Sequence, residues 1–345
     1  MTTGDIRPDQ TRSPGRRGGS LILACGLALL LQACAAKQQP EPQTFEPAAG
    51  EPAGEARALE GRFQADAHEY PWSALGRVNL AGTGFCNGIM VGPRQVLTQA
   101  QCLYSKRDGR WWRPQELHFI TAYQQDRFLA DSKVTRFFTA PGYSPGGGIN
   151  LANLTNNWAV LILSEPIGER SGWLGMQWEN ATLKAAEARG SAVFLRAGYR
   201  LDWPHSISLH FGCKAGDTGL INLCEATPNE LALPPFVISD GALHVVADYY
   251  VRTAGSGALA SRAALTQQGN LMGRPSPPTA GSPIRRNPTA STAAFLEALG
   301  YDTAEQNLSD AMRRYLRDNN LPPRSTADIA FLASLIAKAR NTPSR

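Results

Sequence analysis

The chain has 345 residues, of which 43% are apolar, and its formal net charge is +5. This length can build one large domain or two modest ones, each with a hydrophobic core. The small positive charge is spread along the chain, without basic runs or interleaved basic and aromatic residues. We therefore expect no nucleic-acid partner.

Residues 1–33 are typical of an export signal rather than of folded structure. Arg16 and Arg17 precede an apolar run over Leu21–Leu31, which is the order of a basic region and a hydrophobic region in such signals. The run is too short for a membrane-spanning helix. It ends in LQAC, which resembles a bacterial lipobox with Cys34 as the lipidated residue. A plain signal peptide followed by an incidental cysteine is the alternative.

Residues 34–68 are rich in Pro, Glu, Ala and Gly and show no apolar period. This composition predicts a tether rather than a domain. Ala35, rather than Asp, follows the cysteine, and the resemblance to Gram-negative lipoproteins then implies an outer-membrane lipoprotein that faces the periplasm. The tether would hold a folded domain off that membrane.

Residues 69–268 contain short apolar or alternating runs that are separated by Gly, Pro, Asn and Asp, with no long helical period. Examples are ELHFITAY, WAVLILSEP and SAVFLRAGYR. Runs of this length and spacing predict an all-β sandwich or barrel. The sequence thus predicts a mainly β domain over this range.

The chain has six cysteines. Cys25 falls in the export signal and Cys34 in the lipobox, which leaves an even number in an oxidising compartment. The remaining four allow three pairings, of which two local loops, Cys86–Cys102 and Cys213–Cys224, are the simplest. No CxxC motif or histidine pair accompanies them, so we expect disulfides rather than a metal site.

The C-terminal part changes character. Residues 269–290 are rich in Pro, Gly and Ser and predict a second linker. In residues 291–345 apolar side chains recur at spacings of three and four, which predicts a small three-helix module separate from the β domain. Gly300 would end the first helix, and Ser325 with Asp328 resembles a capping box that opens the last one.

Four motifs, in order, resemble the trypsin/chymotrypsin family in the bacterial branch near the glutamyl endopeptidases. They are GFCNGIMVGPRQVLTQAQC at the histidine turn, NNWAVLILSEPIG at the aspartate segment, AVFLRAGY at a strand of the second barrel, and CEATPNELALPPFV at the nucleophile loop. The resemblance covers about residues 71–265. It implies a trypsin-like double β-barrel followed by the helical module.

The same resemblance implies that the catalytic residues are missing. In active members a serine attacks a carbonyl, a histidine takes its proton and an aspartate orients the histidine. These roles fall on Leu231, Gln101 and Asn157, and the glycine of the oxyanion turn falls on Asn229. An amide cannot take a proton near pH 7 and leucine has no nucleophilic atom. The resemblance thus implies an inactive homologue without a cofactor, whose old substrate cleft binds an envelope protein or peptide.

An active serine-type hydrolase with a relocated constellation is the alternative. Thr218 in AGDTG imitates the nucleophile loop, but its position before the expected strand indicates a hairpin turn. Ser239 precedes Asp240–Gly241, which is typical of a two-residue turn between strands. The histidines occupy none of the matched catalytic positions; they are His68, His118, His205, His210 and His244.

Residues of about 290–339 resemble a peptidoglycan-binding domain. The similar segments are FLEALGYD, LSDAMRRYLRDNNLP and TADIAFLASL, although the family's Asp-Gly-x-Phe-Gly turn is absent between Asp302 and Leu308. The resemblance implies peptidoglycan as a partner, and a helical cap or protein-docking module is the alternative. A third possibility for the whole chain is a purely structural link between the outer membrane and the wall.

Overall fold

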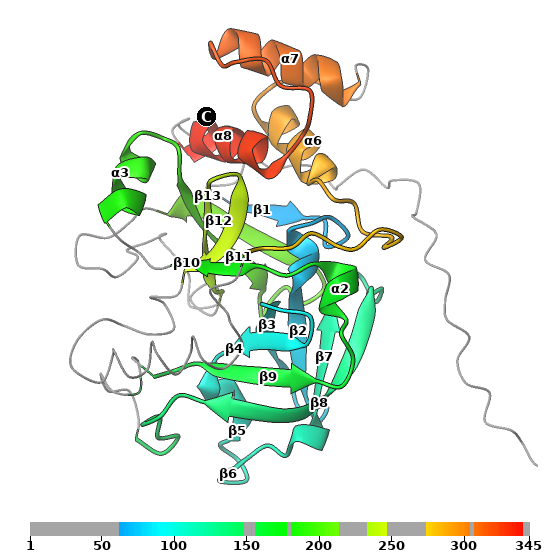
Figure 1. Cartoon of the computed structure of the whole chain (residues 1–345), viewed down its shortest axis with the longest axis vertical. Coiled ribbons are helices and arrows are strands. Elements are labelled where there is room, and N and C mark those ends of the chain that lie inside the picture. The colour runs from blue at the N-terminus through cyan, green and yellow to red at the C-terminus, as the bar shows by residue number, and fades with distance from the viewer. Residues whose placement is uncertain are drawn as a thin grey trace, which may run out of the picture. The chain divides into compact units, whose positions relative to one another are not determined.

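A computed structural model describes residues 62–147, 153, 156–177, 181–213, 233–246, 274–303 and 307–340. All of them lie in the second of two compact units, Phe45–Arg345. Most strands belong to a closed barrel or to an open sheet, and three helices lie beside the sheet (Figure 1). Within the described ranges, no helix is both long and apolar enough to cross a membrane.

The closed barrel has the strand order β2-β3-β4-β9-β8-β7, with antiparallel neighbours throughout. Strand β7 alternates between buried and half-exposed residues, as expected for a strand with one face on a core. The barrel strands are β2 (Leu75–Leu80), β3 (Phe85–Met90), β4 (Gln95–Thr98), β7 (Leu117–Thr121), β8 (Ala130–Thr139) and β9 (Ala159–Leu163).

Glycines on β2 and β3 make room for the buried ring of Phe119 inside the barrel. A Cβ atom on Gly76 would lie 2.4 Å from that ring, and one on Gly88 would lie 2.7 Å from it. Both distances are shorter than a van der Waals contact, so a larger residue at either position would displace the ring. The barrel core therefore depends on a large side chain on one strand facing glycines on its neighbours.

The open sheet has the order β1-β12-β11-β13-β14-β10. Only its last pair, β14 with β10, is parallel. The sequence predicts a second barrel; over the described residues this half is an open sheet, and residues 214–232 and 247–273 lie outside them. The sheet strands are β1 (Arg62–Ala65), β10 (Gly175–Gln177), β11 (Val193–Tyr199), β12 (Ile207–Cys213), β13 (Pro235–Ser239) and β14 (Ala242–Val246).

Several short elements connect these strands. The hairpin of β5 with β6 stands apart from both sheets, and the turn that contains residue 101 is η2. The short elements are β5 (Tyr104–Ser105), β6 (Arg110–Trp111), η1 (Trp72–Ala74), η2 (Ala100–Leu103), η3 (Pro114–Glu116), α2 (Gly168–Ser171) and α3 (Ala181–Ala188).

Strand β1 corrects the predicted end of the tether. The composition predicts a tether up to residue 68, but residues 62–65 pair with β12 as an edge strand of the sheet. The ring of Phe63 stacks on Phe295, with 4.4 Å between centroids. Burial of this aromatic side chain stabilises the pairing, so the folded part begins by residue 62.

Three helices follow in the C-terminal part, as the sequence predicts: α6 (Thr289–Ala298), α7 (Leu308–Asp318) and α8 (Ile329–Arg340). Gly300 has a φ of 87° directly after α6, which is the conformation that commonly ends a helix. Asp328 accepts a hydrogen bond from the Phe331 N–H at 2.8 Å. Asp328, rather than the expected Ser325, therefore provides the side-chain cap of α8.

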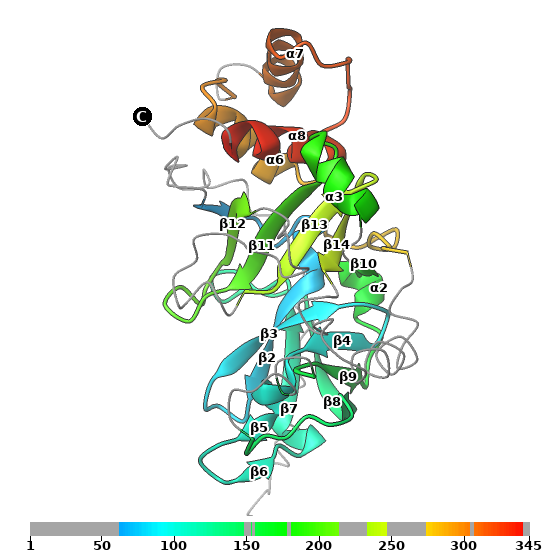
Figure 2. The ribbon, with the colours of Figure 1, turned by 90° about the vertical axis from the view of Figure 1, so that its left-hand side faces the viewer.

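These helices share a core with the open sheet. Helix α6 lies against β1, and α8 lies across β11, β12, β13 and β14, as both views show (Figures 1 and 2). The ion pair of Arg340 with Glu187 joins the end of α8 to α3 at 3.2 Å. The predicted separation from the β domain therefore differs from the structure, because the apolar helix faces find their partners on the sheet.

The expected linker also has specific contacts. Residue Ser276 forms an antiparallel bridge with Trp173, and Arg285 forms a parallel bridge with Glu69. Further along, the Thr279 N–H donates to the Glu169 carbonyl at 2.8 Å. The part of the linker that the structure describes, 274–288, thus lies along the β domain and leads the chain to the start of α6.

Candidate functional site

The barrel brings Gln101 and Asn157 together. Strand β4 leads into η2, which carries Gln101, while Asn157 stands two positions before β9. Because β4 and β9 are antiparallel neighbours with Thr98 opposite Ala159, the residues just beyond this end of the pair are close. The Gln101 backbone N–H donates to Asn157 Oδ1 at 3.0 Å.

The polar side chains where η2 meets the start of β9 are carboxamides. The exposed Gln101 side chain donates from Nε2 to Gln99 Oε1 at 2.9 Å. Asn157 Oδ1 is already the acceptor for the backbone of residue 101. Carboxamides donate and accept hydrogen bonds but do not take up a proton near neutral pH. This corner of the barrel can therefore hold a ligand through polar contacts, but its three amides provide no general base.

A disulfide supports the same turn. Cys86 on β3 is bonded to Cys102 in η2, which confirms the first of the two predicted pairings. Cys213, at the end of β12, is also disulfide-bonded, and its predicted partner Cys224 lies outside the described residues. The Cys86–Cys102 bond fixes the turn that carries Gln101 against the neighbouring strand.

Most of the remaining predicted site residues lie outside the described residues. These are the nucleophile position Leu231, the oxyanion-turn position Asn229, the alternative nucleophile Thr218 and the lipobox residue Cys34. Their roles stay predictions from the motifs.

Ser239, the other alternative nucleophile, is described. It ends β13 and pairs with Ala242 across a two-residue turn. In that turn Asp240 has a φ of 51° and Gly241 a φ of 72°, the two left-handed residues of a type I′ hairpin. The Ser239 hydroxyl is buried and donates to Gln177 Oε1 at 2.7 Å. These contacts agree with the predicted turn.

Three histidines have partners away from Gln101. His68 Nδ1 lies 3.3 Å from Asp66 Oδ1, and His118 Nε2 lies 2.7 Å from Asp131 Oδ2. His205 Nδ1 lies 3.0 Å from the Tyr123 hydroxyl. Among the described residues, no group of three or more His, Cys, Asp or Glu side chains is arranged to hold a metal ion.

Two depressions meet at Gln101, and together we call them the groove. The larger has a volume of about 440 Å³ and lies between the β2–β3 turn and the β5–β6 hairpin. The smaller has a volume of about 170 Å³ and lies toward β11. Residues Cys86, Gln101 and Cys102 line both. The groove therefore crosses Gln101, the residue that the motifs match to the family's histidine position.

Asn87 clamps the barrel to the open sheet beside the smaller depression. Its side chain donates to the Tyr199 carbonyl at 2.9 Å and accepts from the Tyr199 N–H at 2.7 Å. The amide thus pairs with β11 as another strand would. The buried Tyr199 hydroxyl donates to the Tyr123 carbonyl at 2.8 Å, and burial raises the pKa of Tyr199 above its ordinary value. One asparagine and one tyrosine therefore form part of the wall of the smaller depression.

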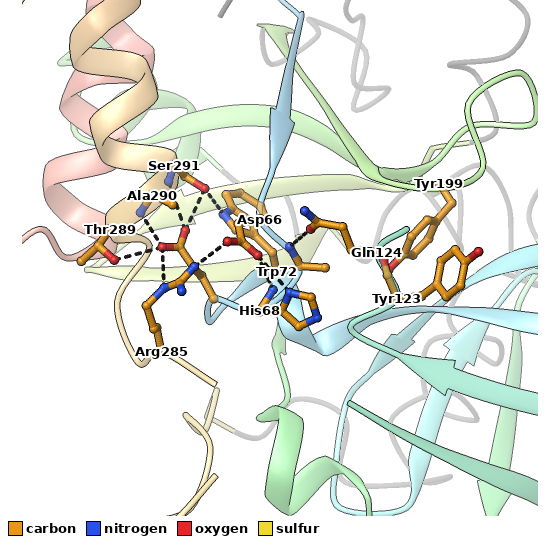
Figure 3. A network of polar contacts seen from close by, with 12 residues as sticks. Asp66, His68, Trp72, Tyr123, Gln124, Tyr199, Arg285, Thr289, Ala290 and Ser291 are labelled. Atoms are coloured by element: carbon orange, nitrogen blue, oxygen red, sulfur yellow. Dashed lines mark hydrogen bonds and ion pairs between the residues drawn. The ribbon is translucent and has the colours of Figure 1, made fainter. Parts of the chain in front are cut away.

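A second polar cluster, centred on Glu69, was not indicated by the sequence. The fully buried carboxylate accepts hydrogen bonds from Arg285 and from the first turn of α6 (Figure 3). The donors are Arg285 Nε, Thr289 Oγ1, the Ala290 N–H, the Ser291 N–H and the Ser291 hydroxyl. A carboxylate at a helix N-terminus is favoured by the unpaired N–H groups and the helix dipole.

Neighbouring Asp66 completes this cluster. Burial raises its pKa, but hydrogen bonds from His68 and the charge of Arg285 outweigh burial and lower the pKa of Asp66 to about 2. Burial raises the pKa of Glu69, while hydrogen bonds from Ala290 and Ser291 act in the opposite direction. No local motif marks these residues, because Glu69 and Arg285 are 216 positions apart. The cluster joins the β domain to α6 and lies apart from the groove.

Comparisons with known proteins agree with the barrel half. Residues 60–192 match the family model described as Trypsin. A glutamyl endopeptidase of Bacillus licheniformis is 27% identical over 146 residues, which are 40% of this chain and 41% of the relative. The match thus spans about two fifths of the curated relative.

A solved structure of a Glu endopeptidase in complex with MPD covers 55% of this chain and 93% of its own, with 16% identity and a TM-score of 0.38. The family match and the six-stranded barrel together show a trypsin-like fold that is mostly β, with few helices in the C-terminal region. The predicted fold class is thereby confirmed.

Proposed function

We propose that this protein is a catalytically inactive trypsin-like protease homologue that binds a polypeptide instead of cleaving it. One observation carries the proposal: Gln101 and Asn157, which the motifs match to the positions of the base and the acid, lie together, and the second accepts from the backbone of the first at 3.0 Å. The turn that carries Gln101 and the segment that carries Asn157 thus stay in contact, but neither side chain can take up a proton.

The loss of rate follows from the chemistry of the three positions. A serine nucleophile needs a neighbouring base to remove its proton, and the base needs an orienting carboxylate. Neither amide can perform those roles, and the motifs put Leu231 at the nucleophile position. Removal of a complete triad leaves at most about 10³- to 10⁴-fold catalysis over water, and only with an intact oxyanion hole.

An active-site-directed fluorophosphonate tests this half of the proposal. We expect no covalent labelling of the purified protein and no cleavage of casein or of a Glu-containing peptide library, while an active serine protease treated in parallel is labelled. Labelling that maps to Thr218 or Ser239 would instead establish the alternative, an active hydrolase with a relocated constellation. The buried turn position of Ser239 and its bond to Gln177 favour inactivity.

The cellular half of the proposal is an outer-membrane lipoprotein anchored at Cys34. An apolar run that ends in LQAC, followed by a segment rich in Pro and Glu, supports it. Several acyl chains hold a protein firmly to a membrane, whereas one holds it weakly. Cys34→Ala should therefore leave the protein soluble or as an uncleaved precursor. A variant that fractionates with outer membranes as the unaltered protein does would refute lipid anchoring.

Peptidoglycan is the proposed second partner, through α6, α7 and α8. The helices support the proposal through their resemblance alone, and their packing on the sheet leaves α7 (Leu308–Asp318) with few contacts outside the helical part. The full-length protein should pellet with purified sacculi. Protein that stays in the supernatant would leave these helices as a structural cap of the sheet.

A further inference from the structure

The two halves of the groove differ in chemistry. The smaller depression is lined by apolar and aromatic groups, including Phe85, Leu201 and Pro234, together with the amides of Asn87, Gln99 and Gln101 and without a charged side chain. Leu201 is 62% exposed, although a large apolar side chain gains free energy when water is excluded from it. The smaller depression is therefore suited to an apolar side chain of a ligand.

The larger depression combines an apolar lining with cations. Leu80, Tyr104 and Trp112 line it together with Lys106 and Arg107 of the β5–β6 hairpin. Side chains of this kind can bury the stem of a ligand side chain while a cation meets its charged end. These cations line the same depression as the disulfide that both depressions share.

The charged side chains that line the larger depression are positive. Lys106 is exposed, and Arg107 is 76% exposed with its Nε 3.1 Å from Asp108 Oδ1. Arg110 is neutralised by a two-pronged contact with Glu116 at 2.8 Å. Among the described residues that line either depression, there is no carboxylate. The described lining of the larger depression therefore favours anionic groups over cationic ones.

We propose that the groove binds an extended acidic segment of a partner polypeptide, with an apolar side chain in the smaller depression and carboxylates at Lys106 and Arg107. The inference rests on the proposed binding function and names the chemistry of its ligand. An extended strand advances about 3.3 Å per residue and turns alternate side chains to opposite faces. Such a segment can therefore cross Gln101 and reach both depressions with residues only a few positions apart.

Fluorescence anisotropy of the purified full-length protein in detergent tests the charge preference. The probes are two fluorescein-labelled nonapeptides, one with a leucine followed by alternating glutamates and the other with glutamines at those positions. We expect the glutamate peptide to bind about tenfold more tightly at low salt, a difference that shrinks as salt screens the ion pairs. The double variant K106E/R107E should lose this preference.

The control is R127E/K133E, which makes the same change in charge on exposed residues of the same barrel outside the groove. It should keep most of the preference. A benzophenone amino acid in place of the leucine should crosslink near Leu201 or Pro234. Equal binding of the two peptides, an equal loss in both double variants, or crosslinks elsewhere would overturn the proposal.

The test also separates other outcomes. Peptides that bind equally, with crosslinks in the groove, would reject the acidic ligand and keep a peptide-binding homologue. A synthetic peptide of residues 38–56 could also release the probe. That result would identify the chain's own Glu-rich tether as the occupant of the groove and overturn the proposal that a partner polypeptide binds there. Fluorophosphonate labelling is independent of all these results, so a failure of the inactive-homologue proposal would be recognised separately.

Discussion

At Glu69, donors from the linker and the first turn of α6 converge on one buried carboxylate. The only full positive charge in this set is that of Arg285, which also pairs with Asp66. Replacement by a neutral amide would leave donors facing the NH₂ group of the new side chain. The residue therefore controls how well the helical part is held to the β domain.

Glu69→Gln should lower the free energy of unfolding by about 3 kcal/mol, because removal of one partner from a buried charge pair leaves the other uncompensated. Urea unfolding followed by tryptophan fluorescence measures the change. Glu165→Gln is the matched control, since Glu165 is exposed and its change should lie within about 0.5 kcal/mol. Equal effects of the two substitutions would contradict the assigned role of Glu69.

His244 gives a second prediction for a single residue. Burial lowers its pKa below the ordinary value of 6.5, and the charge of Asp240 opposes that shift. The folded state then binds fewer protons than the unfolded state, so stability is complete above about pH 6.5 and is lost as the pH falls toward the folded pKa. We expect the Tm to fall between about pH 7.5 and pH 5.

The variant His244→Gln should flatten that dependence, because it removes the titrating group. Differential scanning calorimetry at several pH values measures the slope for both proteins. An unchanged slope in the variant would assign the pH dependence to other groups and contradict the role of His244.

Strands β3 and β11 are joined by the two hydrogen bonds between the Asn87 side chain and the Tyr199 backbone, which we call the Asn87 clamp. Gly198 on β11 leaves the space that the Asn87 side chain needs. A Cβ atom on Gly198 would lie 2.5 Å from Asn87 Oδ1. The φ of this glycine is 146°, which other residues rarely adopt. The clamp therefore depends on the absence of a side chain on β11 as much as on the amide of β3.

Gly198→Ala should destabilise the protein by about 2–3 kcal/mol, from backbone strain and a clash that weakens the clamp. Gly190→Ala is the control: its φ is 73°, but a new Cβ would meet nothing within 4 Å, so strain alone should cost about 1 kcal/mol. Chemical denaturation distinguishes the two values. A loss at position 198 no larger than at position 190 would show that the clash with Asn87 is relieved at little cost.

The elements also show where local patterns suffice. Alternation predicts strand β7, and Asp240–Gly241 predicts the Ser239 hairpin, because each pattern reflects a local backbone preference. No local pattern predicts strand β1, since four residues of a Pro- and Glu-rich region become a strand only by pairing with β12. The register of β4 with β9, which joins Gln101 to Asn157, likewise comes from tertiary pairing.

For the molecule as a whole, the shared core predicts cooperative unfolding. Phe295 of α6 stacks on Phe63 and meets Phe211 edge-on at 5.3 Å between centroids. Phe295→Ala should reduce stability by about 3–5 kcal/mol. Phe128→Ala, at a position that is 43% exposed, should change it by less than about 1 kcal/mol.

Unfolding of the unaltered protein should occur in one transition. Far-UV circular dichroism follows the helices and tryptophan fluorescence follows the barrel, so a shared core requires coincident curves. If the circular dichroism and fluorescence curves separate, the helices unfold independently of the barrel. That result would support the separate helical module that the linker composition predicts.

Periodicity and four ordered motifs predict the fold class and the helices of the C-terminal part. Cysteine spacing makes Cys86–Cys102 part of the simplest of three possible pairings, and the structure confirms that bond. The motifs also match Gln101 and Asn157 to the positions of the base and the acid, and that assignment stays a prediction. Three further features come from the tertiary fold: the turns of Gln101 and Asn157 touch, cations line one half of the groove, and Glu69 accepts hydrogen bonds from the start of α6. Each of these joins residues from distant segments, and such contacts arise from packing and pairing rather than from any local preference of the chain.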